Sequence, residues 1–113
     1  MSTPDYDLSF LLSLDGLEFQ FVQGFVVKIE AREVPATRHR PHGVKYSLTL
    51  HDPVGRRIYG IDNAHGIRGQ PEFDHRHGYG SRKVRGYVYR GPPELLEDFY
   101  REVERILKER GTL

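Results

Sequence analysis

Residues 44–63 limit the possible folds more than any other part of the chain. In the segment VKYSLTLH (44–51), Val, Tyr and Leu alternate strictly with polar residues, which is the pattern of a strand with one buried face. The next four residues, Asp52-Pro53-Val54-Gly55, fit a type I turn, which favours Asp first, Pro second and Gly fourth. Residues 56–63 then read as a returning strand. This hairpin predicts an antiparallel sheet, because short turns join antiparallel neighbours.

Two upstream segments and one downstream segment extend the predicted sheet. Residues 6–14 and 19–29 also alternate, and they predict two strands joined at Asp15-Gly16, a dipeptide that favours tight hairpin turns. Gly24, inside the second of these segments, predicts a bulge or bend. A long loop is expected after residue 63, and residues 84–90 (VRGYVYR) then predict an aromatic strand.

The C-terminal segment predicts an amphipathic helix. Its apolar residues recur at steps of three and four: Leu96, Phe99, Val103, Ile106 and Leu107. Pro92-Pro93 suit the first helical turn, and Gly111 is placed to end the helix. We therefore expect a single domain, residues 1–113, of the α+β class, in which an antiparallel sheet of about five strands is covered by this one helix.

Composition excludes several classes of protein. The chain of 113 residues has no cysteine, so it holds no disulfide, no thiolate zinc site and no cysteine nucleophile. The acidic N-terminus lacks the basic region of a signal peptide, and no apolar run is long enough for a membrane span, so a cytoplasmic protein without membrane contact is expected. Neither a Walker A motif nor an H-E-x-x-H motif occurs.

Basic residues and histidines are concentrated in the middle of the chain. Residues 35–90 carry eleven Lys or Arg and four Asp or Glu, a net charge of +7, and they hold all six histidines. Residues 1–34 carry −4 and residues 91–113 carry −2, which gives the overall charge of +1. This distribution fits phosphate binding, and it fits equally well a surface on which oppositely charged halves pair.

The segment DHRH, residues 74–77, carries the most specific chemistry. His75 and His77 are two residues apart, so in an extended backbone they project to one side. One imidazole can accept a proton near neutral pH while an imidazolium returns one, and these are the two transfers needed when RNA is cut by its own 2′-hydroxyl. Arg76, Arg68 or Arg82 could bind the phosphate. The alternative is a solvated basic loop without chemistry.

Other interpretations of the same residues stay open. Asp74, His75 and His77, with His65 or Asp62, offer oxygen and nitrogen ligands for a metal ion, although H-x-H is a short and common pattern.

Three further positions each have two interpretations. Asp62 either ends a strand locally or orients an imidazole. Lys45 belongs to a phosphate-binding edge or to an ordinary polar sheet face. Tyr87 and Tyr89 either stack on bases or belong to the core.

Four segments together resemble a known family. PHGVKYSLTLHD, GRRIYGIDNAH, DHRH and a helix of the type LLEDFYREVERIL are similar to the TumE-like proteins, over about residues 40–110. The resemblance rests most specifically on the Asp62-Asn63 turn and on the His75-x-His77 element. It implies a small prokaryotic toxin of a type II toxin–antitoxin system, with a helix-turn-helix antitoxin as its partner.

The leading hypothesis is a toxin that acts as a metal-independent ribonuclease without a cofactor. The predicted catalytic residues are His75, His77, Asp62 and Asp74, and the predicted substrate-binding residues are Arg76, Lys45, Asn63 and His65. The alternatives are a non-catalytic module that binds nucleic acid or protein, and a metal-dependent hydrolase that uses the same His and Asp cluster.

Overall fold

The chain forms one sheet and two helices. The structure, a computed structural model, describes residues 6–38, 42–63, 74–78 and 84–112, and for residues 6, 74–78, 84 and 85 it describes the backbone alone. The elements follow in the order α1 (Tyr6–Ser13), β1 (Leu17–Gln20), β2 (Val26–Glu33), β3 (Val44–His51), β4 (Arg57–Asp62), β5 (Asp74–Gly78), β6 (Val84–Tyr87) and α2 (Pro92–Glu109). The predicted α+β class is confirmed.

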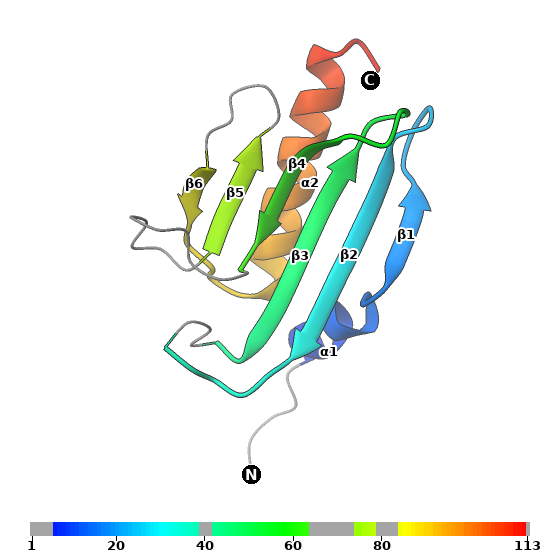
Figure 1. Ribbon diagram of the computed structural model, residues 1–113. Helices are drawn as coiled ribbons and strands as arrows, with labels where there is room; N and C mark the ends of the chain where they lie inside the picture. The colour runs from blue at the N-terminus through cyan, green and yellow to red at the C-terminus, as the bar shows by residue number, and fades with distance from the viewer. Residues whose placement is uncertain (1–5, 39–41, 64–73, 79–83, 113) are drawn as a thin grey trace.

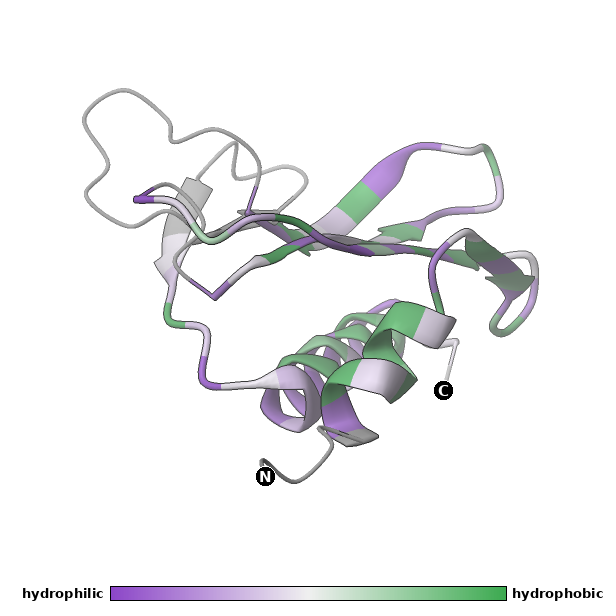
Figure 2. Cartoon of the chain, turned by 90° about the horizontal axis from the view of Figure 1, so that it is seen from below, coloured by the Kyte–Doolittle hydropathy of each residue, from purple (hydrophilic) through white to green (hydrophobic). Residues whose placement is uncertain are grey.

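The six strands form an antiparallel meander in which each strand pairs with the next along the chain (Figure 1). Both helices pack on the same side of this sheet (Figure 2). In the part of the chain that is described, the opposite side of the sheet carries no helix. We call this side the open face, and it holds the alternate strand positions Lys45, Ser47 and Thr49.

The core lies between the sheet and α2. Helix α2 places Leu95, Phe99, Val103 and Leu107 against the sheet at four-residue steps, and each is fully buried. The sheet contributes Val27, Ile29, Leu48, Leu50 and Ile61 from its central strands. Each large side chain buried in this way contributes roughly 1.5–3 kcal/mol to stability, so this layer holds most of the folding energy. The predicted end of the helix is confirmed, since Gly111 has a positive φ of 76°.

The predicted strand at residues 6–14 is wrong, because Tyr6–Ser13 form the helix α1. The segment satisfies both periods: its alternation is real, but Leu8, Leu11 and Leu12 are also spaced for one face of a helix. Packing decides between them, since Leu11 is fully buried in the core. The Asp15-Gly16 turn therefore joins a helix to β1 rather than two strands, and Asp15 accepts a hydrogen bond from the Ala31 N–H at 3.0 Å.

The single long strand predicted for residues 19–29 is a hairpin. Gly24, with φ 85°, and Gln23, with φ 43°, turn the chain between β1 and β2. The hairpin closes through backbone hydrogen bonds between Phe21 and Phe25 and between Phe25 and Val22. Gly24 also abuts Pro53, because an added Cβ would lie 3.3 Å from that ring, so the two neighbouring turns of the sheet pack on each other.

Residues 74–78, which were expected in a long loop, form β5. This strand pairs with β4 on one side and β6 on the other. One predicted strand is a helix, one is divided into β1 and β2, and β5 is added, so the sheet has six strands rather than about five. The strand predicted at residues 44–51 is confirmed with the same bounds as β3. The other two predicted strands are confirmed but shorter, since β4 covers Arg57–Asp62 and β6 stops at Tyr87 rather than at residue 90.

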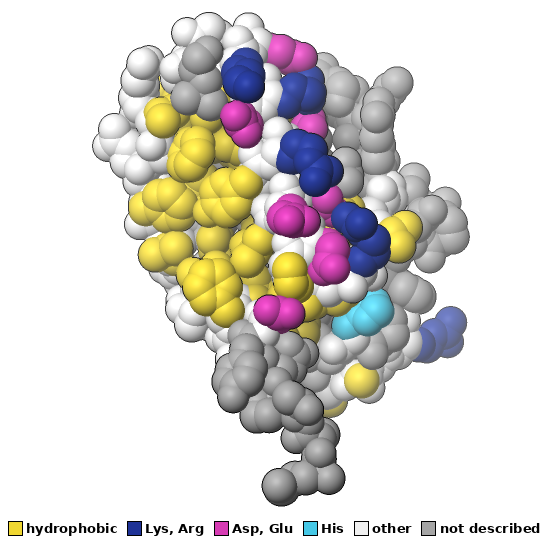
Figure 3. All heavy atoms as spheres, turned by 180° about the vertical axis from the view of Figure 1, so that it is seen from behind, with side chains coloured by type: hydrophobic (Ala, Val, Ile, Leu, Met, Phe, Trp, Pro, Cys, Tyr) yellow, Lys and Arg dark blue, Asp and Glu magenta, His cyan; other side chains and the backbone are white. Residues whose placement is uncertain are grey.

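The helix side of the molecule shows two kinds of surface (Figure 3). Hydrophobic side chains gather on one part of this side, next to a row of charged side chains. Among the apolar residues of the helices, Phe10 is 58% exposed and Leu96 and Tyr100 are half-buried. The outer side of α2 carries alternating charges such as the Arg105–Glu109 ion pair. Neither of the helices in the described ranges is long and apolar enough to cross a membrane.

Candidate functional site

The pairing of β4 with β5 brings the predicted catalytic positions together. Asp62 is the register partner of His75, Ile61 of Arg76, and Gly60 of His77. Asp74 is paired with Tyr87 at the other edge of β5. The structure describes only the backbone of β5, and this backbone gives the positions of these residues in the sheet. Residues 60–62 and 75–77, which the expected loop separates in the sequence, are therefore direct neighbours in the sheet.

Asn63 locks the end of β4 onto β3. Its side chain is 5% exposed, its Oδ1 accepts the Tyr46 N–H at 2.9 Å, and its Nδ2 donates to the Val44 carbonyl at 2.5 Å. The Asn63 N–H also donates to the Tyr46 carbonyl at 3.3 Å. These bonds continue the ladder one residue beyond the strand, so they fix the position of Asp62. The predicted phosphate contact of Asn63 stays a prediction.

Lys45 lies on the open face, as the alternation of β3 predicts, and its side chain is exposed. It is the register partner of Arg32 on β2. Lys45 and Asp62 line the same pocket, which has a volume of about 210 Å³. The structure thus joins one predicted substrate-binding residue and one predicted catalytic residue in one hollow.

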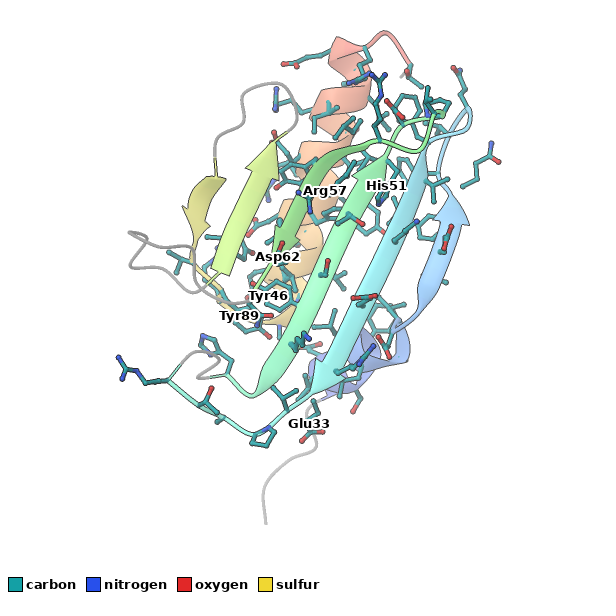
Figure 4. All side chains as sticks on the ribbon, viewed as in Figure 1. Glu33, Tyr46, His51, Arg57, Asp62 and Tyr89 are labelled. Atoms are coloured by element: carbon teal, nitrogen blue, oxygen red, sulfur yellow. The ribbon has the colours of Figure 1, made fainter. Side chains whose placement is uncertain are left out.

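A second group of polar side chains on the open face was not predicted as part of the site. Arg57 is the register partner of His51, beyond a bulge that follows Leu50 (Figure 4). The Arg57 side chain passes Gly60, because a Cβ added at Gly60 would lie 3.8 Å from the Arg57 Cδ. His51 Nε2 lies 2.9 Å from the Thr49 hydroxyl. The strict alternation of the sequence gave no sign of the bulge that pairs Arg57 with His51.

Gly60 has no side chain, so no side chain projects from the open face at this position. A Cβ here would lie 3.1 Å from Thr49 Cγ2 and 3.3 Å from the Leu48 carbonyl oxygen, which is tight for any side chain. Gly60 is also the register partner of His77, and Gly86 is the partner of His75. Each of the two histidine positions therefore has a glycine beside it in the sheet, which leaves room for a ligand above the strands.

Two buried carboxylates secure the strand ends that frame this region. Asp52 accepts hydrogen bonds from the backbone N–H groups of Val54 and Arg56 and from the Arg56 side chain, at 2.9–3.0 Å. Burial raises the pKa of Asp52, but these bonds outweigh it and hold the pKa below its usual value. This arrangement confirms the role predicted for Asp52 in the β3–β4 turn.

Asp98 ties the end of β6 to α2. It accepts hydrogen bonds from the Tyr87 hydroxyl at 2.7 Å and from Arg90 at 2.8 and 3.1 Å. Burial raises the pKa of Asp98, but the hydrogen bonds from Tyr87 and Arg90 lower it by more, so the pKa lies below its usual value. Tyr87 is therefore a core residue, as the more ordinary of its two interpretations had it.

Tyr89 belongs to an aromatic group at the same end of the sheet as Asp62 (Figure 4). Its ring stacks on Tyr46, with centroids 5.5 Å apart, and contacts His42 at 4.6 Å. Tyr46 is buried, while His42 is exposed. The predicted substrate-binding residue His65 lies outside the described residues, as do Arg68 and Arg82.

Metal ligands can be assessed only in part. Among the described side chains, no group of three or more His, Asp or Glu residues is placed to hold a metal ion. The residues proposed from the sequence as ligands lie mainly on β5 and at His65, outside that set.

The family is decided by comparison with known families. The family described as Toxin TumE matches residues 11–107 of this chain, which is most of its length. The chain belongs to the TumE toxin family. Searches of curated proteins and of solved structures each gave no match. Membership in TumE confirms the resemblance found in the sequence, and a toxin of this kind implies an antitoxin partner.

Proposed function

We propose that this TumE-family chain is the toxin of a type II toxin–antitoxin system and that it cuts RNA without a metal ion. The observation that carries the proposal is the register of β4 and β5, in which Asp62 faces His75 and Gly60 faces His77. Cross-strand partners in antiparallel strands share one face of the sheet. The two imidazoles would then stand on the open face, opposite to the helix-covered side.

The proposed reaction is attack of a ribose 2′-oxygen on the neighbouring phosphorus. One of His75 and His77 accepts the 2′-hydroxyl proton as the new oxygen–phosphorus bond forms. The other, as an imidazolium, donates a proton to the 5′-oxygen as the bond between that oxygen and phosphorus breaks. The products are a 2′,3′-cyclic phosphate and a free 5′-hydroxyl, so atoms and charge balance without an added reactant.

The neighbouring residues have supporting roles in this proposal. Asp62 accepts a hydrogen bond from one ring nitrogen of His75 and so fixes its tautomer. Asp74 is the register partner of the buried Tyr87, so the same rule puts it on the helix-covered face, where it would act as a positioning residue at the start of β5. Lys45 and His65 bind the phosphates on the open face. Arg76 is the register partner of the buried Ile61, so the same rule puts it on the helix-covered face and out of reach of those phosphates. Asn63 acts as a positioning residue through its two buried hydrogen bonds to β3. These assignments require no cofactor.

The test is cleavage of a defined RNA oligonucleotide by purified protein, with and without EDTA, beside the His75→Ala/His77→Ala double variant. Cleavage that resists EDTA and is lost in the double variant supports the proposal. Loss of cleavage with EDTA indicates a metal-dependent hydrolase instead. Salt-sensitive RNA binding without any product indicates a non-catalytic binding module.

We further propose that the partner is a helix-turn-helix antitoxin and that the pair acts in the cytoplasm. The family supports this pairing, and the central net charge of +7 over residues 35–90 supports RNA as the target. Co-expression with the protein encoded next to the gene tests the partner. A stable complex that restores growth is the expected result, and toxicity unaffected by that neighbour contradicts it.

A further inference from the structure

A pocket on the open face lies next to the proposed reacting positions. Its volume is about 210 Å³. It is lined by Glu30, Arg32, Lys45, Tyr46, Ser47 and Asp62. Asp62 belongs both to this pocket and to the pair of register partners formed with His75. A ligand in the pocket would therefore continue directly into the proposed cleavage site.

The register explains why the sheet is hollow here. Glu30, Ser47 and Asp62 are direct partners across β2, β3 and β4. The two carboxyl-bearing residues are thus separated by two inter-strand spacings, roughly 9–10 Å. The short side chain of Ser47 lies between them, so the middle of the row is lower than its ends. A flat ring system fits such a row, with its edge toward one carboxylate.

The next row of the pocket carries two positive charges side by side. Arg32 and Lys45 are direct cross-strand partners, and like charges in this position destabilise a sheet. Arg32 has a distant ion pair with Asp15, at 3.9 Å, and Lys45 has no ion pair with any described residue. An anion bound between the two cations would remove this repulsion, and the phosphate of a nucleotide is such an anion.

Glu30 is the other side chain in the pocket with unused capacity. It is exposed on β2, and within the described ranges it takes part in no ion pair or side-chain hydrogen bond. A carboxylate at neutral pH only accepts hydrogen bonds, and it accepts two in parallel from adjacent N–H groups. Guanine presents two adjacent N–H donors, N1–H and N2–H, on its Watson–Crick edge, and the other three bases do not. A surface that merely held the RNA backbone would have no use for this acidic residue.

We propose that this pocket holds one guanine nucleotide of the RNA beside the cleaved bond, with Glu30 reading the base and Arg32 and Lys45 binding its phosphate. The inference rests on the proposed ribonuclease function and adds the base preference of the same site. Glu30 is thereby a specificity-determining residue, and Asp62 stays with His75. RNA is read in this way when an unpaired base is hydrogen-bonded along its Watson–Crick edge.

The test measures binding of the four nucleoside 5′-monophosphates to the His75→Ala/His77→Ala variant by isothermal titration calorimetry. Guanosine monophosphate is expected to bind at least about tenfold more tightly than the other three. Glu30→Gln should remove this preference, and Lys45→Ala should weaken all four. Glu33→Gln is the matched control, because it makes the same charge change at the end of the same strand, outside the pocket (Figure 4).

Equal binding of the four nucleotides, absence of binding, or a guanine preference that survives Glu30→Gln would overturn the inference. Thermal unfolding of each variant confirms that it is folded. Because binding is measured without the reacting histidines, the result is independent of catalysis. A guanine preference in a protein that cuts no RNA would retain the pocket and overturn the ribonuclease, whereas cleavage without any base preference would overturn the pocket alone.

Discussion

Replacing Asn63 with Ala should destabilise the fold strongly for the loss of one small side chain. The change leaves the Tyr46 N–H and the Val44 carbonyl without their partner at a position that is 5% exposed. A buried polar group left unsatisfied costs about 1–3 kcal/mol, so the two together should lower the free energy of unfolding by roughly 2–6 kcal/mol. Domains of this size unfold with only about 5–15 kcal/mol in total.

The assay is urea unfolding followed by circular dichroism, together with a thermal melt. The same loss should lower Tm by roughly 8–24 °C, since about 4 °C corresponds to 1 kcal/mol in a domain of this length. Asn63→Asp keeps an oxygen for the Tyr46 N–H but sets a buried carboxylate oxygen against the Val44 carbonyl, so it should lose at least as much stability at neutral pH. Gln20→Ala, which truncates an exposed amide on β1, should change stability by less than about 0.5 kcal/mol. If Asn63→Ala also changes stability by less than about 0.5 kcal/mol, the hydrogen bonds of Asn63 to β3 do not stabilise the fold and the reasoning is refuted.

Three further predictions concern the core, acid stability and the open face. Phe99→Ala should cost about 3–5 kcal/mol in urea unfolding, because Phe99 is fully buried, and a smaller loss would contradict the layer described here. The pKa of Asp98 is lowered by folding, so its contribution to stability is fully present above the unfolded-state pKa of 3.8 and is lost as pH falls through the lower folded-state value. Tyr87→Phe removes one hydrogen bond to this carboxylate and should reduce the pH dependence of Tm between pH 6 and pH 2. An unchanged pH dependence would contradict this. Arg57→Ala should lower kcat/KM for RNA cleavage at least about tenfold, whereas Arg110→Ala, at the far end of α2, should not; equal effects would remove Arg57 from the site.

The parts of the fold that could be predicted are those specified by neighbouring residues. The β3–β4 hairpin follows from strict alternation and from a turn in which Asp52 bonds its own backbone neighbours. Helix α2 follows from its apolar stripe and from the residues at its two ends. In both cases the local preference and the tertiary contacts agree, so the sequence suffices.

The misses have a common physical origin in non-local packing. Residues 6–14 fit both a strand and a helix, and the burial of Leu11 in the core selects the helix. Residues 74–78 are polar and do not alternate with apolar residues, so nothing local predicts a strand there. They become β5 because β4 and β6 provide backbone partners on both sides.

The sequence offers candidate residues for the site but not their layout in the sheet. The clustering of histidine and arginine pointed to His75 and His77, while their pairing with Asp62 and Gly60 depends on the register of two strands that are distant in sequence. Arg57 escaped notice because a bulge after Leu50 determines its pairing. Glu30 and Arg32 lie on a strand whose polar face looked unremarkable, and only the pocket that they share with Asp62 marks them.

The most direct test of the central claim is mass spectrometry of the ends produced when the protein cuts a short RNA of known sequence. Attack of the ribose 2′-oxygen on the neighbouring phosphorus, with His75 and His77 accepting and donating the protons, predicts a 2′,3′-cyclic phosphate on one fragment and a 5′-hydroxyl on the other. The same RNA with a 2′-deoxy residue at the cleaved position should stay intact. Fragments that carry a 5′-phosphate, or cleavage of the 2′-deoxy substrate at the same bond, would contradict the account.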